Sequence, residues 1–245
     1  MRIKLICCDV FLRQASAFIA ASPHIIDVEY VPMLAHNKPD TLRAGLQARI
    51  NAAAAARNYD LFLLLYGLCG NSTVGLTSPV KLIMPRVHDC CTMFMGSYDR
   101  FAKEFGNNLS MRWCTSGYYE RSYLDNAPDS FPTQSRETYP EYRALVEQYG
   151  EDNAEYIWDT LHPDIETPEA AYIRLKDFES PSYENDFRGL VENQGKTLRV
   201  VEGDTSYIQA LINGPWDNKR FLTINPGEKI GAVYDMHQVV TAEPV

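Results

Sequence analysis

The sequence lacks long apolar runs, clusters of basic residues, internal repeats and low-complexity segments. No apolar run reaches the roughly 18 residues that a membrane-spanning helix requires, so we expect no contact with a membrane. The formal net charge is −9 and no run of Lys and Arg occurs, which excludes nucleic acid as a partner. A Cys-x-x-Cys pair, the usual sequence mark of a structural zinc module, is also missing.

The first residues lead directly into a short apolar run that ends at Cys7 and Cys8. This pattern predicts a first core strand, because a secretory segment has a longer apolar region followed by small residues. We therefore expect a cytoplasmic protein, in a compartment where disulfides are rare. The six cysteines are then predicted to be free thiols or metal ligands.

Strand-like and helix-like segments alternate over the first half of the chain. Predicted strands cover 3–8, 25–33, 61–66 and 81–85, and predicted helices cover 10–21, 41–56 and 91–105. Asp40 is the predicted N-cap of the second helix. The alternation predicts an α/β fold with a doubly wound, mostly parallel sheet of the flavodoxin/Rossmann-like kind. With 245 residues and a hydrophobic fraction of 45%, residues 1–245 are expected to form a single domain.

Residues 122–185 interrupt this alternation. The segment contains an acidic, tyrosine-rich helical stretch at 141–161, and it predicts a helical insertion or cap packed on the sheet. Strand character resumes at 198–201, followed by a helix at 205–211 and a last strand at 220–224.

Cysteine and histidine gather just after three of the predicted strands. Cys8 follows the first strand, Cys69 the third, and His88 with Cys90 the fourth. In open α/β sheets, ligands bind outside the carboxyl ends of the strands. Neighbouring strands lie about 4.8 Å apart, and metal ligands lie about 2.0–2.3 Å from the ion. Side chains from three adjacent strand ends can therefore meet at one ion, and an extended backbone would point His88 and Cys90 the same way.

Three thiolates and one imidazole form a ligand set that suits zinc, and thiolate-rich sites also suit an iron–sulfur cluster. The competing interpretation is that cysteine is simply a small residue of the core, and we favour it for Cys7 and Cys91. Cys114 lies further downstream without a predicted role.

Three polar residues beside these segments have candidate roles, two of them in binding a small-molecule substrate. Arg86 and Asn71 are predicted to hold its anionic end, although Arg86 could equally pair with a surface acid. Asp89 either orients His88 or caps the helix that starts there, and the cap is the simpler interpretation. The glycines of this region match neither a Walker sequence nor G-x-G-x-x-G, so a nucleotide loop is not predicted.

Several short blocks of the chain resemble a domain-of-unknown-function family of anaerobic bacteria and archaea. They lie at 6–8 (ICC), 66–71 (YGLCGN), 85–90 (PRVHDC), 96–101 (GSYDRF), 214–216 (GPW) and 226–227 (PG). Members of that family are often encoded near corrinoid-dependent methyltransferases. The resemblance implies an association with one-carbon metabolism, and with it a corrinoid protein as a candidate partner, but no established activity.

Three functions remain open from the sequence. The first is a metal-dependent enzyme or accessory factor of methyl transfer, in which zinc on Cys8, Cys69, His88 and Cys90 activates a thiol. The second is a non-catalytic carrier or activator that holds a metal or iron–sulfur centre on the same ligands. The third is a metal-free enzyme similar to two-thiol racemases, in which two cysteines act as acid and base.

Overall fold

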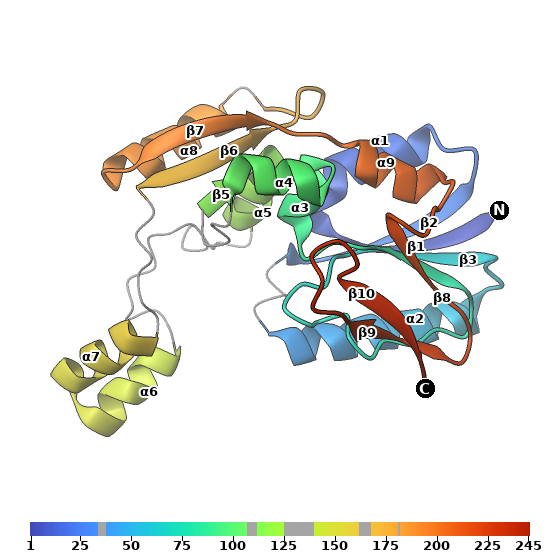
Figure 1. The fold of residues 1–245 in the computed structure, drawn as a ribbon, viewed down its shortest axis with the longest axis horizontal. Helices are drawn as coiled ribbons and strands as arrows, with labels where there is room; N and C mark the ends of the chain where they lie inside the picture. The colour runs from blue at the N-terminus through green and yellow to red at the C-terminus, as the bar shows by residue number, and fades with distance from the viewer. Residues whose placement is uncertain (34–37, 107–111, 125–139, 162–167, 181) are drawn as a thin grey trace.

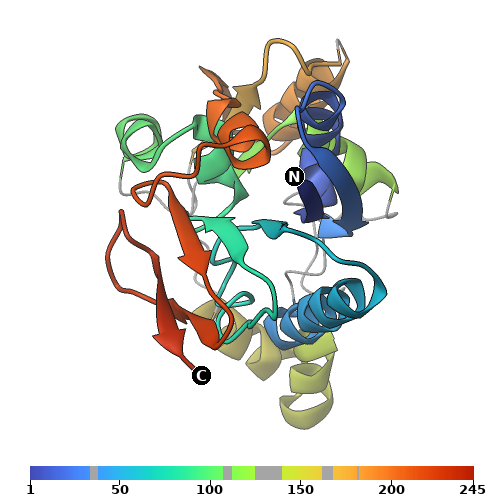
Figure 2. The same cartoon turned by 90° about the vertical axis from the view of Figure 1, so that its right-hand side faces the viewer.

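The strands of the described residues form a mostly parallel main sheet, a smaller parallel sheet and an antiparallel hairpin (Figure 1). The computed structural model describes residues 1–33, 38–106, 112–124, 140–161, 168–180 and 182–245. Figures 1 and 2 both show the hairpin below the main sheet and the second sheet above it. Among the described residues, no helix combines the length and the apolar character needed to cross a membrane.

The main sheet is built from short apolar runs in the order β2-β1-β3-β4-β8. Its strands are β1 (Arg2–Cys8), β2 (Ile25–Val31), β3 (Leu61–Leu65), β4 (Leu82–Pro85) and β8 (Phe221–Ile224). The first four strands pair in parallel, and β8 pairs antiparallel with β4. Every residue of β3 and β4 is buried, as expected for strands covered on both faces. The prediction of a mixed α/β fold with a mostly parallel sheet is confirmed.

Helices cover both faces of the main sheet (Figures 1 and 2). On one face lie α1 (Leu12–Ala20), which follows the short 3-10 helix η1 (Asp9–Phe11), and α9 (Ser206–Asn213). The other face is covered by α2 (Pro39–Ala56). The predicted N-cap Asp40 is wrong, because this helix begins one residue earlier, at Pro39, a residue whose fixed φ suits a first turn.

The single helix predicted over 91–105 is two helices, α3 (Cys90–Met95) and α4 (Tyr98–Phe105). Gly96 ends α3 with a φ of 78°, and the side chain of Ser97 then accepts a hydrogen bond from Arg100 N at 3.1 Å. A Cβ atom on Gly96 would lie 2.7 Å from Cβ of Asp204, so the break is also a point of close packing. The amphipathic pattern concealed this break because apolar residues continue on both sides of it.

A second parallel sheet, in the order β5-β6-β7, was not predicted. Its strands are β5 (Arg112–Cys114), β6 (Glu169–Arg174) and β7 (Thr197–Glu202), with helices α5 (Ser116–Leu124) and α8 (Tyr183–Asn193). The strand expected at 198–201 therefore belongs to this sheet and not to the main one.

The structure describes two helices in the middle of the segment 122–185, which is predicted to be a helical insertion. Helices α6 (Pro140–Tyr149) and α7 (Glu151–Leu161) pack against each other, with Tyr142 and Trp158 in edge-on contact. Strand β6 lies inside the same segment and is the central strand of the second sheet, so the segment is not wholly helical. Figure 1 shows the α6–α7 pair apart from both sheets, and a role as a cap stays a prediction.

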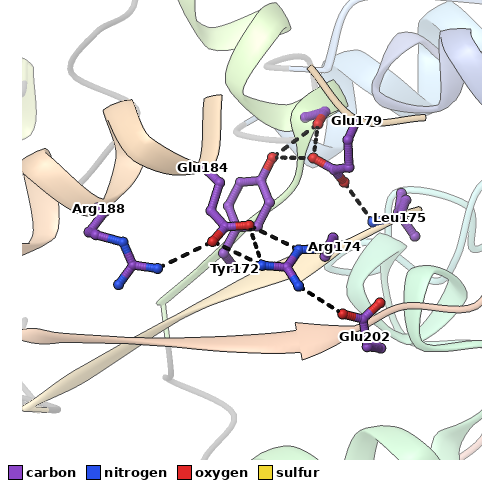
Figure 3. A network of polar contacts seen from close by, with 8 residues as sticks. Tyr172, Arg174, Leu175, Glu179, Glu184, Arg188 and Glu202 are labelled. Atoms are coloured by element: carbon purple, nitrogen blue, oxygen red, sulfur yellow. Dashed lines mark hydrogen bonds and ion pairs between the residues drawn. The ribbon is translucent and has the colours of Figure 1, made fainter. Parts of the chain in front are cut away.

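Buried hydrogen bonds fix the second sheet to its helices (Figure 3). The carboxylate of Glu179 accepts from Ser116 Oγ at 2.6 Å and from Tyr172 Oη at 2.7 Å. Beside it, Arg174 on β6 donates to the carboxylate of Glu184 on α8, at 2.8 Å in the closest contact. Because both hydroxyl-bearing side chains are fully buried, their bonds to Glu179 replace the water they lose on folding.

The antiparallel hairpin consists of β9 (Glu228–Ala232) and β10 (Val240–Pro244). It is attached to the turn that follows β3. Gly75 N donates to Ile230 O at 2.7 Å, and Ile230 N donates to Leu76 O at 3.0 Å. These two bonds place the hairpin, which lies near the end of the chain, beside the turn that follows β3. They join residues that are far apart in the sequence.

Candidate functional site

The segments that follow β3 and β4 are joined by their backbones. Leu68 N donates to Val87 O at 2.9 Å, and Cys69 N donates to His88 O at 2.8 Å. These bonds continue the pairing beyond the ends of both strands. A Cβ atom on Gly67 would lie 2.9 Å from Val87 O and 2.9 Å from Asp89 N, so only glycine permits this approach.

Cys69 occupies a backbone conformation that few side chains adopt. Its φ is 46°, and Gly70 and Asn71 follow with φ values of 61° and 67°. Holding a non-glycine residue in this left-handed region costs about 1–3 kcal/mol, and such residues cluster at functional sites. Ser72 Oγ donates to Cys69 O at 2.6 Å, and Thr73 Oγ1 donates to Gly67 O at 3.2 Å, which stabilises the turn.

Cys8, Cys69 and Cys90 come together at the carboxyl edge of the main sheet. Burial raises the pKa of the Cys8 thiol, and a charge on Cys69 raises it further. Burial likewise raises the pKa of Cys90, with further contributions from Asp89, Cys69 and Cys8. Burial raises the pKa of Cys69 to about 12; the Gly67 N–H opposes this shift, and the charge of Asp89 adds a smaller rise. Each pair of these three thiols is therefore close enough for their ionisations to interact.

Two tyrosines adjoin the three thiols. The Tyr66 hydroxyl lies close enough to Cys8 to lower the pKa of that thiol, and it has no other polar partner among the described side chains. Tyr118 comes from α5, and its pKa is raised by burial and then by Cys90, Cys114 and Cys8. The sequence did not predict Tyr118 as a site residue, because α5 belongs to the unpredicted second sheet.

Helix α5 reaches the thiols because its first turn packs on η1. A Cβ atom on Gly117 would lie 2.3 Å from Val10 O, so the two backbones are in direct contact. The N–H of Val10 in turn lowers the pKa of Cys8. The second sheet thus contributes one wall of the site, through a glycine that no pattern in the sequence distinguishes.

His88 and Asp89 lie between β4 and α3. Asp89 is the N-cap of α3, accepting from Thr92 N at 3.0 Å, so the cap interpretation is confirmed. The backbone of Asp89 is extended, and α3 begins directly after it at Cys90. His88 lines a cavity of ≈ 760 Å³ together with Asn71, and its role as a metal ligand stays a prediction.

The guanidinium of Arg86 is engaged by the backbone. It donates to Asn218 O at 3.0 Å, to Gln238 O at 3.2 Å and to Val240 O. Burial lowers the pKa of Arg86. These contacts favour a structural role, in which Arg86 holds the loop between β9 and β10, over the predicted contact with a substrate anion.

All six cysteines are free thiols. Cys7 and Cys91 have no exposed surface, as expected for the core residues that we took them to be. Cys114 is also fully buried, at the end of β5 in the second sheet. In the described ranges, no three His, Cys, Asp or Glu side chains are already arranged around a common point for a metal ion.

The fold and site together define an α/β protein with a thiol cluster at the carboxyl edge of its main sheet. The chain belongs to a family described as "Protein of unknown function (DUF1638)", whose family model matches residues 30–212. The match includes Cys69, His88 and Cys90 and begins after Cys8. Neither a comparison with curated proteins nor one with solved structures gave a match.

We predict that Gly67→Ala destabilises the protein by about 1–3 kcal/mol, the usual cost of an added methyl group in a packed region. Its Cβ would meet backbone atoms on Val87 and Asp89, which no side-chain rotation can relieve. Urea unfolding measures the change. Gly189→Ala in α8 is the matched control, because its Cβ would have no atom within 4 Å, and equal effects of the two substitutions would contradict the prediction.

We predict that stability falls in alkaline solution and that Cys69 contributes to the fall. Above the ordinary thiol pKa of about 8.5, the unfolded chain releases a proton that folded Cys69 retains until about pH 12. The free energy of unfolding therefore decreases as pH rises through this window, by up to about 1.4 kcal/mol per pH unit for this thiol. Urea unfolding at pH 7 to 10 should show a shallower decrease for Cys69→Ser. Identical slopes for the two proteins would refute the assignment.

Proposed function

We propose that this protein binds a soft metal ion, with zinc as the first candidate, through the thiolates of Cys8, Cys69 and Cys90. The observation that carries the proposal is the proximity of three thiols beyond three adjacent strand ends. They are close enough that a charge on one raises the pKa of another. Thiolate sulfur is the ligand type that zinc and iron–sulfur clusters use.

The raised pKa values support a cation as the missing partner. Without one, burial keeps these thiols protonated near neutral pH, and a protonated thiol is neither a good nucleophile nor a metal ligand. A bound cation would displace the protons and offset the repulsion between the thiolates. The Tyr66 hydroxyl is placed to donate to Cys8 once that thiol has lost its proton.

Binding would require movement of side chains, since the three thiols are not preassembled around an ion. Rotation of cysteine side chains about χ1 is the smallest change that could draw them together. His88 is the fourth predicted ligand. With three thiolates bound, the fourth position of the ion could be taken by His88, by a substrate or by water. An open position is typical of catalytic zinc sites, whereas structural sites are closed.

We further propose methyl transfer as the reaction class, in a cytoplasmic protein whose main sheet is of the flavodoxin-like kind. The strand order β2-β1-β3-β4 supports the fold assignment. The family resemblance supports the reaction class and a corrinoid protein as partner. Zinc with an open position lowers the pKa of a bound substrate thiol, which leaves a nucleophile for a methyl group.

One observation favours a metal-free alternative with two thiols. Tyr118 couples to Cys8 and Cys90 of the main sheet and to Cys114 of the second sheet, so thiols from two separate sheets approach one hydroxyl. Cysteines from two halves of a protein are what the two-thiol mechanism requires. Against it, burial raises the pKa of Cys114 as well, which disfavours a thiolate base near neutral pH.

Metal analysis of protein purified without oxygen, followed by zinc titration of the metal-free protein, tests the proposal. We expect about one zinc per chain, with affinity reduced at least roughly tenfold in Cys8→Ala, Cys69→Ala and Cys90→Ala. Cys91→Ala and Cys114→Ala are matched controls that remove a buried thiol but not a proposed ligand.

The outcomes separate the alternatives. Iron with visible absorption, lost in the same three variants, would replace zinc by an iron–sulfur centre. Absence of metal, together with loss of thiol-dependent activity in Cys114→Ala, would support the two-thiol reaction. Equal zinc affinity in all five variants would contradict the proposed ligands.

A further inference from the structure

The cavity beside the thiol cluster has the size of a ligand pocket. It measures ≈ 760 Å³, within the range of roughly 300–1,000 Å³ that is usual for small-molecule sites. Its walls come from α2, from the turn after β3, from the segment before α3, and from the loop between β9 and β10. The residues that matter here are Arg43, Asn71, His88, Tyr234, Asp235 and Met236.

Two nitrogen atoms on this wall are buried and lack a hydrogen-bond partner, namely Arg43 Nε and His88 Nε2. Arg43 is held in place by its other nitrogens, which donate to Asp40 Oδ1 at 3.0 Å and to Asn71 O at 2.9 Å. Leaving a buried polar group unpaired costs about 1–3 kcal/mol, and more when the group is charged. Arg43 and His88 both line the cavity, so an acceptor on a bound molecule is a partner that could satisfy both nitrogens when the His88 proton is on Nε2.

The loop between β9 and β10 contributes an apolar and exposed part of the lining. Tyr234 is fully exposed, and the side chain of Met236 is 44% exposed. The loop that carries them is well fixed, because Asp235 Oδ1 accepts from His237 N at 2.9 Å and from Gln238 N at 2.7 Å. Arg86 anchors the far end of this loop through Gln238 O and Val240 O. The apolar side chains are thus presented by a preformed loop.

Strain in the same loop supports a binding role. Val239 is buried and has a φ of 57°, a conformation that is a true outlier for a β-branched residue. Such strain persists where the surrounding structure enforces it, and ligand clamps are among the places where it is found. The negative charge of Asp235 is partly offset by the two N–H groups that its Oδ1 accepts.

We propose that this cavity binds a small molecule in which an anionic group, a carboxylate or a phosphate, is joined to an apolar body. Arg43 and His88 bind the anionic oxygens, and Tyr234 and Met236 contact the apolar part. The site does not depend on the metal proposal, since its nitrogens are not among the three thiols. It lies near them, because Leu68 on its wall precedes Cys69 directly.

Calorimetric titration with phenyl phosphate and phenylacetate, compared with neutral 2-phenylethanol, tests the site in a phosphate-free buffer. We expect at least one anion to bind and the alcohol to bind at least roughly tenfold more weakly. Arg43→Gln and His88→Gln should each weaken anion binding by a similar factor. Arg49→Gln is the matched control, because this arginine lies on the same helix with the same 36% exposure and pairs with Glu29 elsewhere.

A second measurement needs no variant, so it still applies if the variants fail to fold. In the unaltered protein, NMR of the His88 ring nitrogens, during addition of the phenyl compound that binds, should show a saturable shift at Nε2. Equal binding of anions and alcohol, no binding by either anion, or equal weakening in Arg49→Gln would each overturn the proposal. Zinc affinity should be unchanged in Arg43→Gln, which separates failure of this site from failure of the thiol centre.

Discussion

The close backbone approach at Gly67 is the constraint on which the thiol cluster depends. Two strand ends can pair beyond the sheet only because no side chain stands between Gly67 and the segment from Val87 to Asp89. This pairing fixes Cys69 beside the start of α3, where Cys90 lies. Cys8 joins them because β1 and β3 are neighbours in the parallel sheet. One missing Cβ atom thus determines how two of the three segments meet, and strand pairing places the third beside them.

Burial then determines the chemistry of the cluster. Each of the three thiols loses water on folding, so each has a raised pKa and retains its proton near neutral pH. The second sheet completes the enclosure by packing Gly117 against Val10 and adding Tyr118. A cluster of this kind gains reactivity only when a partner displaces the protons, and a soft cation is the partner whose chemistry fits.

Much of the main sheet could be predicted from the sequence, because strands buried on both faces leave continuous apolar runs such as Leu61–Leu65. The location of Cys8, Cys69 and Cys90 beyond the ends of β1, β3 and β4 followed from the same pattern, since carboxyl ends of neighbouring parallel strands share one edge. Their role as metal ligands stays a prediction. The N-cap at Asp89 could also be predicted, because aspartate is a favoured cap residue at the start of a helix. The role of His88 as a ligand stays a prediction.

The second sheet and its contribution to the site could not be predicted in this way. Strand β6 reads EAAYIR, and its two alanines and flanking charges give neither a long apolar run nor a strict alternation. The cavity depends on contacts between residues that are far apart in the chain, such as Gly75 with Ile230 and Arg86 with Val240. No short window of sequence contains both partners of such a contact.

The measurement that tests the central claim most directly is X-ray absorption at the zinc edge on zinc-loaded protein. It counts the sulfur atoms around the ion and measures their distance from it. The account predicts three sulfur neighbours at about 2.3 Å, reduced to two in Cys69→Ala. A shell of nitrogen and oxygen alone, or a sulfur count unchanged in that variant, would show that zinc binds elsewhere and would contradict the thiol centre.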